Sequence, residues 1–113
     1  MTNVTAIANA SGGQNSIGIV INGFSSPTMT NVTANASGGT YCRGVANNYS
    51  FATMTNVTAT GFGGAECYGI SLTDRSSTFI HSSNIEGDTK GLYISADSAG
   101  SQIANSQIIG GVD

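Results

Sequence analysis

One hexapeptide recurs in this chain, and its spacing limits what the chain can fold into. Met-Thr-Asn-Val-Thr-Ala begins at Met1, Met29 and Met54, and weaker copies begin at Ile80 and Ile103. A Gly-rich stretch follows each strong copy. A glycine then opens a short apolar segment, and these glycines are Gly18, Gly44, Gly69 and Gly91. A period of 22–28 residues, repeated about four and a half times, indicates a repeat architecture.

The unit fits one coil of a parallel β-solenoid. It carries short β-favouring segments and lacks the i, i+3, i+4, i+7 apolar spacing of a helix. Helical repeats and leucine-rich repeats are therefore excluded, and a propeller blade is longer. Three short strands per coil can each pair with their counterparts one coil away, at about 4.8 Å. We predict one all-β domain over residues 1–113, with coils at about 1–28, 29–53, 54–79, 80–102 and 103–113.

Alternation along the unit predicts which side chains face the core. Asn31 takes a sharp bend, because Asn tolerates the left-handed conformation. Val32 and Ala34 then point inward, and Thr33 points outward. Stacking the coils predicts four inward columns: Met1, Met29, Met54, Ile80 and Ile103; Val4, Val32, Val57, Ile85 and Ile108; Ile19, Val45, Ile70 and Leu92; and Ile21, Leu72 and Ile94, which Asn47 interrupts.

Asparagine at a bend before an inward Val or Ile, with Gly-opened strands, resembles a known repeat. It looks like the right-handed parallel β-helix of the pectin-lyase-like superfamily, and like the Asn-, Thr-, Ser- and Gly-rich arrays of bacterial extracellular and surface proteins. The resemblance covers Met1 to about Gly111, although the last two units depart from the consensus. It implies a right-handed coil and an extracellular or cell-surface location, with no signal peptide in the chain. The fold serves lyases, hydrolases, tailspikes, adhesins and spacers, so function stays open.

Two sets of asparagines are candidates for a structural or a glycosylation role. Asn3, Asn31 and Asn56 share one column, which Asn84 joins by a small register adjustment. We interpret this set as a bend ladder in which each amide donates to the next carbonyl, with N-glycosylation as the alternative. Further acceptor sequences begin at three asparagines that we expect in loops, where glycosylation stays open: Asn9, Asn35 and Asn48.

Cys42 and Cys67 each lie two residues before the strand-opening glycine of their coil. They therefore occupy one column in adjacent coils, and a spacing of about 4.8 Å falls within the Cα separation of a disulfide. One alternative is a disulfide that joins the two coils in an extracellular or periplasmic setting. The other is a stacked pair of free thiols in a reducing compartment.

Groups that carry out chemistry are scarce. Only 8% of the residues are charged, and the one histidine, His81, has no carboxylate beside it to orient it toward Ser82 or Ser83. The carboxylates form no facing pair or metal cluster in the sequence: Glu66, Asp74, Glu86, Asp88, Asp97 and Asp113. We therefore expect no catalytic residue, metal or cofactor.

Charge and hydropathy also limit the partners. Three cations against six anions argue against nucleic acid, and no apolar run is long enough to span a membrane. The outward aromatic residues can stack on sugars or pack against another part of the protein: Tyr41, Phe51, Phe62, Tyr68 and Tyr93.

Neither end of the array resembles a cap, since Met1 already holds a repeat position. We expect a fragment of a longer β-helix, or an uncapped subunit that stacks end to end into a filament. The preferred function is a non-catalytic spacer, adhesin stalk or filament subunit. The alternatives are a glycan-binding tailspike or adhesin module and a fragment of a polysaccharide lyase or hydrolase.

Overall fold

The chain consists mainly of strands joined by short turns. The computed structural model describes residues 2–10, 15–95, 98 and 101–110. Their strands are β1 (Thr5–Ala10), β2 (Asn15–Ile21), β3 (Thr28–Gly38), β4 (Tyr41–Asn48), β5 (Phe51–Phe62), β6 (Glu66–Thr73), β7 (Ser77–His81), β8 (Asn84–Gly87), β9 (Lys90–Ile94), β10 (Gln102–Ala104) and β11 (Gln107–Ile109). The described residues contain no helix, and so none long and apolar enough to cross a membrane.

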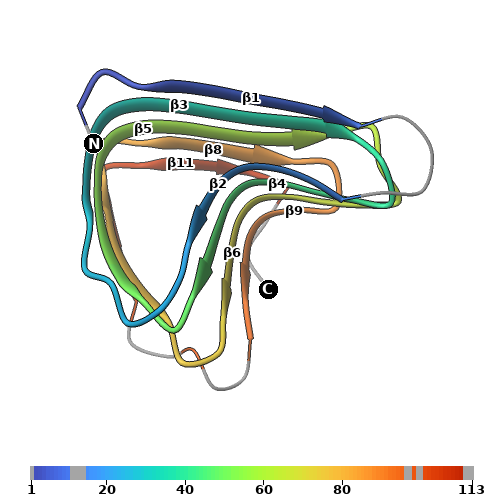
Figure 1. Cartoon of the computed structure of the whole chain (residues 1–113). Helices are drawn as coiled ribbons and strands as arrows, with labels where there is room; N and C mark the ends of the chain where they lie inside the picture. The colour runs from blue at the N-terminus through green and yellow to red at the C-terminus, as the bar shows by residue number, and fades with distance from the viewer. Residues whose placement is uncertain (1, 11–14, 96–97, 99–100, 111–113) are drawn as a thin grey trace.

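Each strand pairs in parallel with its counterparts in the neighbouring coils. One sheet has the order β1-β3-β5-β7-β10, with β8 pairing both β5 and β11, and the other has the order β2-β4-β6-β9. Figure 1 shows these strands stacked layer upon layer in chain order. The predicted all-β fold is confirmed as a parallel β-solenoid of about four turns.

Three of the four predicted inward columns are in register over the described residues. The first contains Met29, Met54, Ile80 and Ile103, whereas Met1 lies outside the described residues. In the second sheet, one column contains Ile19, Val45, Ile70 and Leu92, and the next contains Ile21, Asn47, Leu72 and Ile94. The core is therefore a narrow file of aliphatic and Met side chains that runs along the solenoid axis.

The predicted valine column is wrong in the fourth coil and also in the fifth, where Ile108 pairs with Ile85. Val32 pairs with Val57, but Ile85 pairs with Ala59. Ser83 therefore takes the valine position, where its hydroxyl accepts a hydrogen bond from the buried backbone N–H of Val57 at 3.0 Å. Because Ile85 replaces a small alanine, the apolar volume lost at Ser83 is recovered two residues later.

The number of strands per coil differs between coils. β3 and β5 run through Asn31 and Asn56, each with a φ of 54°, so the first two predicted strands are one bent strand. In the fourth coil the bend falls at Ser82, with a φ of 50°, and separates β7 from β8. The predicted three strands therefore describe the fourth coil, whereas the second and third coils have two each.

The column of glycines lies inside the strands of the second sheet, not at their start. These strands turn sharply in their middle, so that each has two arms (Figure 1). A Cβ atom at Gly44 would lie 2.7 Å from the carbonyl oxygen of Gly69 and 2.8 Å from that of Ala34. The backbones of neighbouring segments are in such close contact here that only glycine fits.

Buried serines line the corner that precedes β3, β5 and β7, a feature that the sequence analysis missed. The backbone N–H groups of successive coils donate to hydroxyl oxygens of the next: Ser25 to Ser50 at 3.3 Å, Ser50 to Ser76 at 3.2 Å and Ser76 to Ser98 at 3.0 Å. This serine ladder supplies acceptors for the buried backbone N–H groups of Ser50 and Ser76, whereas Ser25 at its edge is exposed.

Candidate functional site

The first corner of the first three coils carries an asparagine ladder on the surface of the solenoid. Nδ2 of Asn31 donates to Oδ1 of Asn3 at 3.1 Å, and Nδ2 of Asn56 donates to Oδ1 of Asn31 at 2.5 Å. All three residues have a positive φ, between 54° and 55°. Their side chains are exposed, so the ladder fastens the coils from outside the core.

Asn84 does not belong to this ladder, contrary to the expectation from the sequence. Asn84 begins β8, two residues beyond the bend at Ser82, and it pairs with Thr58 of β5. The register adjustment that would align Asn84 with Asn56 does not occur, because Ile80 pairs with Met54 and the chain continues without an insertion.

The three further acceptor asparagines lie in strands, so the loop placement expected for them is wrong. Asn9 is in β1, Asn35 is in β3 and Asn48 ends β4. Each Oδ1 accepts a hydrogen bond from a hydroxyl in the next coil: Ser37 donates to Asn9, Thr60 donates to Asn35 at 2.6 Å, and Thr73 donates to Asn48. These side chains therefore also connect neighbouring coils. Their Nδ2 atoms, where a glycan would be attached, take no part in these bonds.

Cys42 in β4 and Cys67 in β6 form a disulfide that joins adjacent coils. The two residues are direct register partners, and their Cα atoms lie 4.5 Å apart. Both side chains are fully buried beside Ala36, in a small cluster next to the Gly-rich turn. The disulfide therefore links the second coil to the third beside the Gly-rich turn, at the far end of β3 and β5 from the asparagine ladder.

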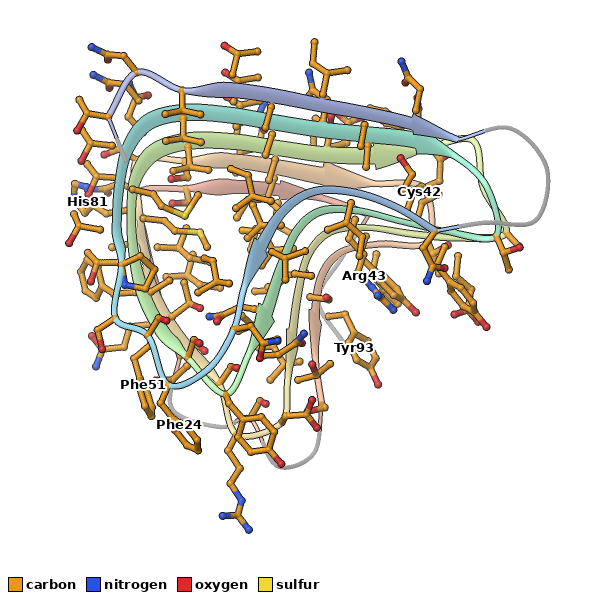
Figure 2. The ribbon with its side chains drawn as sticks, viewed as in Figure 1. Phe24, Cys42, Arg43, Phe51, His81 and Tyr93 are labelled. Carbon is orange, nitrogen blue, oxygen red and sulfur yellow. A yellow bond between two sulfur atoms is a disulfide. The ribbon has the colours of Figure 1, made fainter. Side chains whose placement is uncertain are left out.

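Aromatic and charged side chains gather in the inner angle between the two arms of the second sheet. Arg43, Tyr68 and Lys90 form one outward column on the first arm. The ring of Tyr93 on the second arm stacks on Tyr68, with centroids 5.0 Å apart and planes at 22°. Figure 2 shows Arg43 and Tyr93 projecting into the same angle. We call these residues, with Tyr41 and Glu66 beside them, the inner-angle cluster.

The electrostatics of the inner-angle cluster favour a neutral Tyr68 and an available cation. Burial raises the pKa of the Tyr68 phenol above its usual value, and the negative charge of Glu66, which accepts a hydrogen bond from that phenol at 3.4 Å, raises it further. The guanidinium carbon of Arg43 lies 5.8 Å from the centroid of the Tyr41 ring, a cation–π distance. Arg43 and Lys90 are two of the three basic residues in a chain with a net charge of −3.

Other reactive side chains are dispersed. Nδ1 of His81 lies 2.9 Å from Oγ of Ser82, and the Phe79 ring stacks on the imidazole. Oδ2 of Asp88 accepts the backbone N–H of Gly63 at 2.8 Å. The part of the chain that the structure describes contains no pocket and no group of three His, Cys, Asp or Glu residues that could hold a metal. Asp97 and Asp113 lie outside that part.

Comparison of the chain with protein-family models, with curated proteins and with solved structures finds no match. The assignment of the fold therefore rests on the strand pairing, and the interpretation of the inner-angle cluster rests on its own geometry.

Proposed function

We propose that this chain is a non-catalytic structural segment of an extracellular or surface protein, in which the solenoid is a rigid spacer or stalk. The observation that carries the proposal is that side chains fasten neighbouring coils at all three corners. The asparagine ladder acts at the first corner, and the serine ladder acts at the corner that precedes β3, β5 and β7, which we call the second corner. The disulfide lies beside the Gly-rich turn, which forms the third corner. These bonds add to the backbone pairing and oppose bending between coils.

The compartment and the continuation of the solenoid belong to the same proposal. Disulfides persist in oxidising compartments, which favours the extracellular side, and the resemblance to bacterial surface arrays favours the same location. Parallel strands at the edge of a solenoid pair readily with further strands. In this function the coils continue into a longer parent chain or into a copy stacked end to end.

Hydrogen exchange of the purified chain, with and without reductant, tests the rigid spacer. We expect slow amide exchange in all strands of the second to fourth coils, from β3 to β9. Reduction should accelerate exchange first in β4 and β6, which the disulfide joins. Fast exchange throughout the oxidised chain would contradict a rigid segment.

Protease accessibility of the protein on intact cells tests its location, because a surface segment is cut without lysis.

A second candidate function is glycan binding, and the inner-angle cluster favours it. Tyrosine rings offer apolar faces to sugar rings, and a guanidinium binds carboxylate or sulfate groups through paired N–H donors. The stacked Tyr68 and Tyr93 lie within the same angle as Arg43, so both kinds of contact can reach one ligand.

A glycan array with the native chain and a Tyr93→Ala variant tests this second function. Binding that the native chain shows and Tyr93→Ala loses supports it. Phe62→Ala is the matched control, because Phe62 is an exposed aromatic at the end of β5, outside the cluster. No binding by the native chain, or equal loss in both variants, would count against a glycan site here.

A further inference from the structure

Large side chains occupy left-handed backbone positions at the second corner. Phe24 and Tyr49 have φ values of 63° and 51°, and each directly precedes a serine of the serine ladder. Arg75 holds the same place before Ser76, with a φ of 62°. Bulky residues are uncommon in this conformation, which costs free energy unless the residue is Gly or Asn. At the first corner, asparagine fills the corresponding positions in three coils.

These large side chains contribute little to the core of their own chain. Phe24 is 77% exposed, Tyr49 41% and the adjacent Phe51 51%. Phe24 and Tyr49 contact each other, with ring centroids 5.4 Å apart. Figure 2 shows Phe24 and Phe51 projecting side by side from the same corner. A sequence that keeps exposed aromatics on an unfavourable backbone points to contacts outside the chain, and aromatic residues are enriched in protein interfaces.

Opposite charges flank this patch. Asp74 and Arg75 follow one another at the same corner, and both are exposed. Within the described residues neither of them forms an ion pair. A twofold axis places a patch against itself, so a patch with one cation beside one anion is electrostatically complementary to its own copy. We call Phe24, Tyr49, Phe51, Asp74 and Arg75 the aromatic corner.

We propose that two copies of this chain associate side by side through the aromatic corner. The rings of Phe24, Tyr49 and Phe51 pack against those of the second copy, and Asp74 of each copy pairs with Arg75 of the other. The contact is lateral and closed, so it differs from the end-to-end continuation proposed above. It joins two stalks along their length and does not extend one.

Sedimentation equilibrium over a wide concentration range tests the dimer, with one double variant and one control variant. The native chain should pass from its monomer mass of 11.3 kDa to twice that mass. Phe24→Asn combined with Tyr49→Asn should stay monomeric while its urea midpoint is equal to or higher than that of the native chain, because Asn suits the left-handed positions. Phe62→Asn, at an exposed aromatic position elsewhere, should leave the dimer intact.

Charge reversal identifies the partner as a second copy. Asp74→Arg alone places like charges together and should weaken the dimer at least tenfold, as should Arg75→Asp alone. An equimolar mixture of these two variants should associate again, since each then supplies the charge that the other needs. A native chain that stays monomeric up to its solubility limit overturns the proposal. A dimer that survives the Asn substitutions, or a mixture that fails to associate, also overturns it.

Discussion

Asn47 is a buried amide in a column of aliphatic side chains. It lies between Ile21 and Leu72 in register and is fully buried. Its Nδ2 donates to Oγ1 of Thr78 at 3.0 Å, but its Oδ1 has no hydrogen-bond partner among the described residues. A buried carbonyl without a partner costs about 1–3 kcal/mol, so this one position lowers the stability of the core.

We predict that replacing both members of this pair stabilises the protein. Asn47→Leu with Thr78→Val should raise the free energy of unfolding by about 1 kcal/mol, since both polar groups leave the core together. Asn47→Leu alone should gain less, because Thr78 then loses its donor. Urea denaturation measures both, with Thr53→Val at an exposed position of β5 as the control. A double variant less stable than the native chain would show that Oδ1 is satisfied by water.

At the scale of an element, the bend inside β3 combines a backbone conformation with a side-chain ladder. Asn31 has a φ of 54° and bonds to asparagines in both neighbouring coils. Asn31→Gly keeps the conformation and removes the ladder, so we predict a loss of about 1 kcal/mol in unfolding free energy. Asn31→Ala loses both and should cost about 1 kcal/mol more.

Urea unfolding of the two variants separates these contributions. Asn84→Ala is the matched control, because Asn84 lies outside the ladder and its loss should change stability by less than about 0.5 kcal/mol. Equal losses for Gly and Ala would show that the bend conformation contributes nothing.

The sequence predicts the elements wherever like residues repeat one above another. The Met and Ile columns, the bend at Asn31 and the placement of the cysteines all follow from the repeat. This reasoning fails in the fourth coil. The sequence suggests Ile85 for the valine position, but Ser83 occupies it and accepts a hydrogen bond from a backbone N–H. The serine ladder escaped notice because serine is common along the whole chain. The inner-angle cluster depends on the bend within the second sheet, which the repeat does not reveal.

For the whole molecule, the disulfide and the two ladders all hold neighbouring coils together along the solenoid axis. Reduction, or Cys42→Ser with Cys67→Ser, should lower the free energy of unfolding by about 2–4 kcal/mol. Thermal unfolding with and without reductant measures the loss, and a reductant effect on the double serine variant would indicate a cause other than this bond. Each coil packs on its neighbours, so a coil that unfolds removes part of the packing surface of the next coil. We therefore expect the second and third coils, once reduced, to unfold in the same transition as the other coils.

The same bond has a consequence when the molecule is pulled by its ends. The cysteines are register partners 25 residues apart, so the disulfide closes one full coil into a covalent ring. Under tension the coils on either side of the ring can unfold and extend, but the segment within the ring cannot add to the end-to-end length. At 3.3–3.6 Å per extended residue, about 85 Å of contour is withheld until a reductant cuts the ring. The thiol state therefore sets the maximum reach of the molecule under load.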